Sequence, residues 1–376
     1  MNFFPFPDPI PLPAPIWLFK ALHILTLALH FVAVEILLGG LLVAVWLNFI
    51  SAGKSGDKSG LRLNAAAALA RRLPIVMTYV INLGVPPLLF AQVLYGRMLY
   101  TSSVLIGMWW ISVIVLLTLC YWLLYKFAAD AEQGKPGWWK GLLAWLIAGV
   151  IAKIYVSNMT LMIRPEVWAD MYAQNANGMA LPPSHPLLLL RWGYMLTGGL
   201  VVAGLWMLWI STRRSIADTL RPYLFNTGGR LALLAVVLGF LGFQVAGGQA
   251  AEVQKALAAN MFYHLAGYGW VAMIVLVAAV GGVAAFAKCP QNLIAYAGSL
   301  LGFLLIACMV IYRDGIRDMT LLQRGYDVWD PVANKVVTNW SVVGIFLVSF
   351  VLGLVILGWL VSVMMRAKNV TEKVNP

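Results

Sequence analysis

The sequence predicts an all-α, polytopic membrane bundle of nine transmembrane helices, with the N-terminus outside and the C-terminus in the cytoplasm. Of 376 residues, 62% are hydrophobic and only 11% are charged, and the mean hydropathy is +0.85. Soluble domains of this length do not have such a composition, whereas bundles of membrane helices do. The distribution of apolar runs and of basic residues supports the same interpretation.

Nine apolar runs are each long enough to cross the hydrocarbon core of a bilayer. They divide the chain into a proline-rich outer-surface segment (1–15), a nine-helix transmembrane domain (16–365) and a cytoplasmic tail (366–376). The first run exceeds the length of one crossing, so we expect it to tilt or to extend beyond the membrane. The expected spans are 16–50, 74–96, 102–126, 140–163, 186–211, 229–248, 262–287, 292–312 and 340–365.

The positive charges indicate the orientation. The formal net charge is +12, and most of the 26 lysines and arginines lie around 51–73, 126–140, 212–230 and 288, and in the tail. These connections alternate along the chain and so share one membrane face, which the positive-inside rule assigns to the cytoplasm. No basic stretch accompanies a soluble binding module, so the charge predicts topology and not nucleic-acid binding.

Two further features bear on the fold. Pro86-Pro87 interrupts the second run, and we expect a kink there. The connection from Arg313 to Asn339 balances basic residues with aspartates, and we expect it to be the largest loop on the outer side.

Two of the four histidines, His23 and His30, lie in the first apolar run. Seven residues make two helical turns, so both imidazoles fall close to one face of one helix. Ionisable side chains are costly in hydrocarbon and usually turn inward to a partner. Both are candidate ligands of a non-covalently held haem b. The alternative for His23 is a residue that only forms hydrogen bonds within the bundle.

The other two histidines, His185 and His264, open the fifth and seventh runs, which both begin on the expected outer side. Six-coordinate haem needs two axial ligands from opposite sides of a flat ring, and facing helices supply them. By depth, His185 and His264 fit one such pair, and His30 or His23 is then left for a second haem. His185 also lies in a Pro-Pro-Ser-His-Pro stretch, which is typical of a solvated turn.

The charged residues within the expected spans include Glu35, Lys153 and Arg191. Cations in low dielectric usually neutralise a carboxylate, and Arg191 is placed to bind a haem propionate. The alternative for Arg191 is a cation that extends to the interface. Glu35 is either a proton-path carboxylate or the partner of a cation on another helix.

The cysteines limit the possible cofactors. The three that are present, Cys120, Cys289 and Cys308, form no Cys-x-x-Cys-His motif. This excludes covalent c-type haem attachment, a zinc cluster and an iron–sulfur site as intrinsic features.

Several short stretches carry a family resemblance: Leu29-His30-Phe31 before Gly39-Gly40, Ser157-Asn158 with Met162 and Pro165, Arg191–Tyr194, Gln254–Ala259 and Gly267–Gly269. Together they resemble motifs of subunit I of the cytochrome bd quinol oxidases, a family with nine spans and an outside N-terminus. The resemblance covers the whole chain. It implies that His30 is an axial haem ligand, that Asn158 lies in a cofactor-binding stretch and that Lys255 belongs to a quinol-site segment.

The chain also departs from that family's pattern. Leu265 and Leu188 stand near the positions of the family's other axial ligands, so the resemblance implies a shifted pair, His264 with His185. The runs 102–126 and 340–365 contain no carboxylate where the family keeps glutamates, and Gly315–Met319 is an altered form of its Gly-Arg-Gln-Pro-Trp motif. These departures count against complete three-haem oxygen reduction.

We therefore expect a haem b-binding subunit of a bd-type complex in a bacterial cytoplasmic membrane. It would pass electrons between the quinone pool and a separate redox protein such as a cytochrome c, or oxygen, alongside other membrane subunits. Two alternatives remain open. One is a degenerate, structural bd-like subunit that supports a catalytic haem subunit. The other is a transporter with Glu35, Lys153 and Arg191 along its path.

Overall fold

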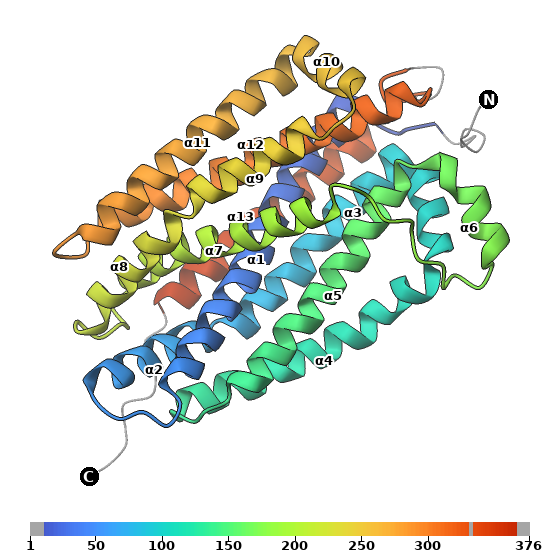
Figure 1. The fold of residues 1–376 in the computed structure, drawn as a ribbon. Coiled ribbons are helices and arrows are strands. Elements are labelled where there is room, and N and C mark those ends of the chain that lie inside the picture. Colours follow the sequence, from blue (N-terminus) through green and yellow to red (C-terminus); the bar gives the residue numbers. More distant parts are fainter. Residues whose placement is uncertain (1–10, 331–333, 367–376) are drawn as a thin grey trace.

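The computed structural model describes residues 11–330 and 334–366, and this part of the chain is an all-helical bundle with no named strand (Figure 1). Within it, nine helical segments are long and apolar enough to cross a membrane, which confirms the expected number of spans. Two of the nine are pairs of helices in close succession, α2 with α3 and α8 with α9. The spanning helices are α1 (Ile16–Ser51), α2 (Asp57–Ala70), α3 (Leu73–Leu105), α4 (Gly107–Glu132), α5 (Trp138–Met162), α7 (Leu188–Ser211), α8 (Leu220–Ala232), α9 (Ala235–Gly247), α11 (Met261–Phe286), α12 (Asn292–Gln323) and α13 (Trp340–Arg366).

We call the end of the bundle at which α1 begins the N-terminal end. The opposite end, at which α13 ends, is the C-terminal end (Figure 1). Three short helices complete the described structure: the 3₁₀ helix η1 (Pro165–Val167), α6 (Trp168–Gln174) and α10 (Ala251–Ala259).

Helix α1 lies in the middle of the bundle, against α3, α5, α7 and α12 (Figure 1). Its crossing with α7 depends on glycine. A Cβ atom on Gly39 would lie 1.8 Å from the backbone oxygen of Gly199, so no larger residue lets the two backbones approach this closely. The crossing fixes the face that α1 turns toward α7.

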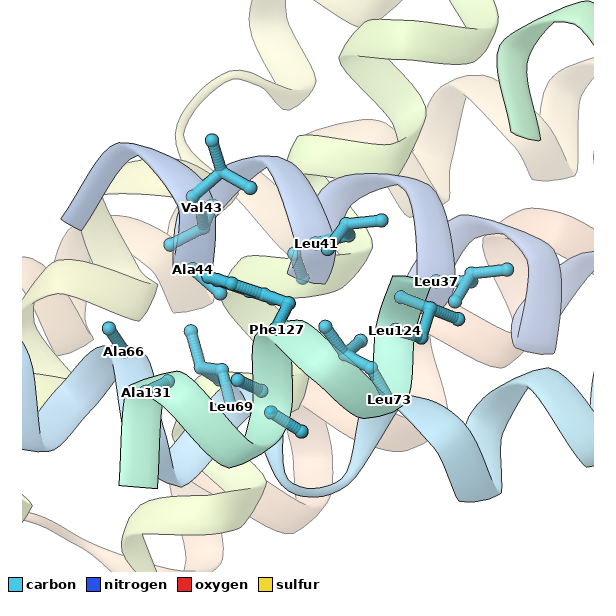
Figure 2. Close-up of a cluster of buried hydrophobic side chains, with 14 of the residues drawn as sticks. Leu37, Leu41, Val43, Ala44, Ala66, Leu69, Leu73, Leu124, Phe127 and Ala131 are labelled. Carbon is cyan, nitrogen blue, oxygen red and sulfur yellow. The ribbon is translucent and has the colours of Figure 1, made fainter. Parts of the chain in front are cut away.

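The apolar core at the C-terminal end holds α1 in place. Figure 2 shows Leu41 and Ala44 of α1 next to Leu69 of α2 and to Leu124 and Phe127 of α4. All five side chains are almost completely buried. Interdigitated packing of this kind resists sliding of one helix past another, so the N-terminal half of α1 is held at a fixed rotation.

The expected outer loop from Arg313 to Asn339 is wrong in its first part, because α12 continues as a helix to Gln323. Asp314 and Asp318 of this extension are 3% and 4% exposed. Buried charges persist only where they are paired and hydrogen-bonded, and partners from other helices supply that pairing here. The loop proper begins after Arg324.

The expected kink at Pro86-Pro87 is also displaced. α3 continues through both prolines, and its non-helical backbone lies instead at Tyr95, with φ −131° and ψ 25°. Near the prolines, a ring nitrogen of His23 lies 3.0 Å from the backbone oxygen of Pro87. This contact joins α1 to α3 beside the two prolines.

The segment before α1 is tied to the connection before α13. The Leu12 backbone N–H donates to the Lys335 oxygen at 2.8 Å, and the Val337 N–H donates to the Leu12 oxygen at 2.9 Å. The pairing forms a single parallel bridge between Leu12 and Val336. Residues 1–10 of the expected surface segment and 367–376 of the expected tail lie outside the described residues.

Candidate functional site

A cavity of about 610 Å³ lies in the N-terminal half of the bundle. Residues of α1, α5, α7, α9, α10, α11 and α12 form its wall, and on each long helix they lie toward the N-terminal end. The volume is within the range of small-molecule and cofactor sites, and such sites in bundles form between facing helices. Most of the wall is apolar, so a few polar side chains determine its chemistry.

Helix α1 turns one face toward this cavity through Leu27, Phe31 and Glu35. Spacings of four residues place these side chains above one another on a helix. The crossing of α1 with α7 at Gly39 and Gly199 lies about one turn further along. Since that crossing fixes the rotation of α1, it also fixes which α1 side chains reach the cavity.

Three arginines line the cavity: Arg191 of α7 and Arg313 and Arg317 of α12. Arg317 forms an ion pair with Asp314. Arg313 lies over the Phe31 ring at 5.5 Å from its centroid, and it forms no ion pair within the described ranges. Arg191 donates only to the Thr160 hydroxyl, at 3.4 Å. Two cations in the cavity wall therefore have no carboxylate partner within residues 11–330 and 334–366.

One imidazole stands in the same wall. His264 lies in the first turn of α11, and its ring makes an edge contact with the Tyr268 ring at a centroid distance of 4.7 Å. α11 begins at this position because the Asn260 side chain caps it, accepting from the backbone N–H groups of Phe262 and Tyr263. The cap places His264 at the N-terminal end of the cavity.

A buried polar cluster adjoins the cavity at that end. We call the side chains of Lys20, Tyr95, Tyr263, Asp314 and Asp318 the lysine–aspartate cluster. The Lys20 ammonium donates to Tyr95 at 2.5 Å and to Asp314 at 2.7 Å, and it is also paired with Asp318. The Tyr95 and Tyr263 hydroxyls donate to Asp318 at 2.6 Å and 2.8 Å.

This cluster joins four helices, α1, α3, α11 and α12, and its charges are balanced. Arg317 lies over the Tyr95 ring, 4.1 Å from the centroid, and pairs with Asp314. Two cations thus face two carboxylates in a region where Lys20 is 4% exposed. Sequence reasoning did not identify the cluster. The available indication was the repeat of arginine and aspartate at a four-residue spacing, Arg313-Asp314 and Arg317-Asp318.

The histidine pair on α1 faces a different neighbour. His23 contacts Pro87 of α3, and a Cβ atom on Gly84 of α3 would lie 2.9 Å from the His30 ring. The two rings therefore do share one side of α1, as the spacing predicts, but that side packs against α3 and not against the cavity. His23 Nε2 and His30 Nδ1 are buried without a hydrogen-bond partner. Their assignment as haem ligands stays a prediction.

His185 precedes α7 and is not among the residues that line the cavity. Its Nδ1 accepts a hydrogen bond from the Leu187 N–H at 3.2 Å. Burial and the positive charges of Arg191 and Arg164 lower the pKa of His185, so the neutral, ligand-competent imidazole is favoured. The proposed pairing with His264 stays a prediction.

The remaining candidate residues lie outside the cavity wall. Asn158 of α5 is fully buried and donates to the Ser103 hydroxyl of α3 at 3.1 Å, while its Oδ1 has no partner. Lys255 is exposed on α10, and Lys153 is exposed on α5. The cavity thus brings together Arg191, His264 and Glu35, but not the other predicted site residues.

Among the described residues, no three histidine, cysteine, aspartate or glutamate side chains come together as a protein-only metal site would need. A haem needs fewer protein ligands, because the porphyrin supplies four of its own. An apolar wall, one imidazole and two unpaired arginines suit a flat apolar group with anionic substituents. The donor set therefore fits haem b.

No protein-family model matches this chain, and a search of curated proteins finds no match.

Proposed function

We propose that this protein is a haem b-binding subunit of a membrane electron-transfer complex, with one haem in the cavity between α1, α7, α11 and α12. A single observation carries the proposal. Arg191 and Arg313 line an apolar cavity together with His264, and neither arginine has a carboxylate partner among the described residues.

Each residue type has a role that follows from its chemistry. An unpaired cation inside a membrane bundle is costly, and a bound carboxylate removes that cost. Arg191 and Arg313 would hold the two propionates, since guanidinium groups bind carboxylates with directed hydrogen bonds. His264 would supply an axial nitrogen. The haem, when bound, supplies a one-electron centre.

The electron route rests on chemistry and on the resemblance to quinol oxidases. We propose that the protein lies in a bacterial cytoplasmic membrane with its N-terminal end outside, as the basic connections indicate. The cavity opens in the half of the bundle toward that end. We propose that a quinol supplies electrons and that a separate redox protein, such as a cytochrome c, accepts them.

The test begins with the purified protein in detergent. A pyridine haemochrome assay measures haem per chain, and we expect a value near one or above. Haem near zero in protein that elutes as a single symmetric peak would overturn the proposal and favour a structural subunit.

Variants then test the site. His264→Ala should remove or shift the reduced haem spectrum, and the Arg191→Ala, Arg313→Ala double variant should lower haem retention during purification. Arg230→Ala is the matched control, because Arg230 is exposed on α8 and lies outside the cavity wall. His185→Ala tests the predicted ligand pair. An unchanged spectrum in His264→Ala would refute the assignment of His264.

A further inference from the structure

Glu35 is the one carboxyl group that α1 presents to the cavity, and it is 6% exposed. It rests on the small residues of α7: a Cβ atom on Gly199 would lie 3.1 Å from its Oε2, and one on Gly198 would lie 3.5 Å from both carboxyl oxygens. Any side chain larger than hydrogen at Gly199 would crowd the carboxyl group. The α1–α7 crossing therefore creates the space in which Glu35 lies.

The carboxyl group has no ionic partner. Oε2 is buried and accepts no hydrogen bond, and Glu35 forms no ion pair within the described ranges. The Tyr194 hydroxyl lines the same cavity and accepts a hydrogen bond from the Trp270 indole at 2.9 Å, but it does not donate to Glu35 Oε2. The expected alternative of a cation on another helix is not realised. A buried, unpartnered carboxyl group that lines a cavity is placed to act on what the cavity holds.

Position along α1 separates Glu35 from the lysine–aspartate cluster. Glu35 is fifteen residues further along the chain than Lys20, which corresponds to roughly 22 Å of helix at 1.5 Å per residue. Glu35 thus stands at the deep end of the cavity, and the arginines stand nearer the N-terminal end. The charged and titratable groups of the cavity wall are Arg191, Tyr194, His264, Tyr268, Tyr312, Arg313, Asp314 and Arg317, together with Glu35.

The other carboxyl group, the arginines and the imidazole of that wall each have an ionic partner, a fixed charge or an assigned role. Asp314 is paired with Lys20 and Arg317, and the arginines stay charged at all relevant pH values. His264 is exposed in the first turn of α11, and our proposal assigns it to the metal. Glu35 remains as the buried group that is free to change its charge.

We propose that Glu35 is the proton-exchanging residue of this cavity and that it takes up a proton when the bound haem is reduced. The inference rests on the proposed function. With haem bound, one electron would enter it from a quinol or from a chemical reductant. For that electron, one proton from the bulk solvent would reach the Glu35 carboxylate through water in the cavity, and Oε2 would form an O–H bond. On oxidation the electron and the proton both leave, and the net charge of the buried site stays constant.

Coulomb interactions are strong in a low-dielectric interior, so an added electron is best stabilised by a proton taken up nearby. Coupled uptake of a proton and an electron makes the midpoint potential of the haem depend on pH. For one proton per electron, the potential falls by about 59 mV for each tenfold fall in proton concentration.

The experiment is a redox titration of the haem-loaded protein, followed in the visible spectrum over the neutral pH range. We expect a sloping potential in the wild type, a slope reduced to near zero in Glu35→Gln, and a wild-type slope in Glu132→Gln. Glu132 is the matched control because it is exposed at the end of α4. A wild-type slope in haem-loaded Glu35→Gln would overturn the inference.

Infrared difference spectroscopy gives a readout that is independent of the redox titration. Reduction of the wild type should produce the carbonyl band of a protonated carboxyl group, and that band should be absent in Glu35→Gln. A haem-loaded wild type with a pH-independent potential and no such band would refute the role of Glu35 and leave the proposed function standing. A chain that binds no haem would overturn both.

Discussion

Replacement of Lys20 by methionine should strongly destabilise the protein, because it removes the cation from the lysine–aspartate cluster. Lys20 contacts Tyr95, Asp314 and Asp318, and its side chain is 5% exposed against 2% for each aspartate. Arg317 still pairs with Asp314. Asp318 would keep only the hydroxyl donors of Tyr95 and Tyr263.

The loss in the free energy of unfolding can be estimated in two ways. Hydrogen bonds inside membrane proteins average about 0.6 kcal/mol each, so three lost contacts amount to about 2 kcal/mol. Breaking a buried ion pair from one side costs about 3–5 kcal/mol, because a charge is left without compensation. The second figure corresponds to roughly a 100- to 4,000-fold change in the unfolding equilibrium. We expect the larger loss, since Lys20 is the only cation that pairs with Asp318 among the described residues.

The assay is equilibrium unfolding in mixed micelles, followed by tryptophan fluorescence, for Lys20→Met, Asp318→Asn and the double variant. The double variant should be more stable than Lys20→Met alone, because asparagine removes the uncompensated charge and keeps the tyrosine contacts. Lys153→Met is the matched control, and its exposed position on α5 predicts a change within about 0.5 kcal/mol. The reasoning is refuted if Lys20→Met unfolds like the control, or if the double variant is no more stable than Lys20→Met.

Three further predictions concern the α1–α7 crossing, the reduction of oxygen and the stability of the protein at low pH. Gly39→Ala should cost about 1–3 kcal/mol by overpacking the α1–α7 contact, whereas Gly149→Ala, with nothing within 4 Å of its Cβ, should be neutral or stabilising in the same unfolding assay. If the protein reduces oxygen, carbon monoxide should shift its reduced spectrum; an unchanged spectrum counts against that reaction. Burial raises the pKa of Glu166, but hydrogen bonds from Arg324 outweigh it and hold the pKa below its ordinary value. The Glu166–Arg324 contact therefore stabilises the protein above the unfolded-state pKa of Glu166. This stability is lost as the pH falls through the folded-state pKa. Arg324→Ala should therefore reduce the dependence of the free energy of unfolding on pH in the acid range.

The membrane spans could be predicted from the sequence because each one depends only on the residues within it. A helix that crosses a bilayer must be apolar along its whole length and satisfies its own backbone, so each span leaves a continuous pattern. The predicted ends of the helices were less accurate where a helix continues through charged residues. α12 extends through Arg313 and Asp318 to Gln323, since partners on other helices offset the charges that a local pattern counts as loop.

The candidate site was harder to predict because rotation about a helix axis depends on distant contacts. The spacing of His23 and His30 correctly placed both on one side of α1. Which neighbour that side meets depends on the glycine crossing with α7 and on α3, and the sequence pattern of α1 contains neither. Leu27, Phe31 and Glu35 form the face that reaches the cavity.

The lysine–aspartate cluster could not be predicted because its residues are far apart in the sequence. Lys20 and Asp318 are 298 residues apart, so no motif of fixed spacing contains both. Pairing of this kind becomes visible only after the helices are arranged in space. Arg191 could be singled out from the sequence because the cost of a cation in an apolar run is local to its own helix, and the structure places it in the cavity wall.

The contact between the first and the eighth span also constrains how the protein is made. Lys20 and Asp314 are 294 residues apart, and a ribosome adds about 5–20 residues per second. Lys20 is therefore synthesised roughly 15–60 s before its first carboxylate partner. During that time α1 must keep the ammonium group near the lipid headgroups, and it can take its final depth only after α12 has been inserted. The ion pairs of the lysine–aspartate cluster therefore form only after α12 has been synthesised, long after Lys20 itself.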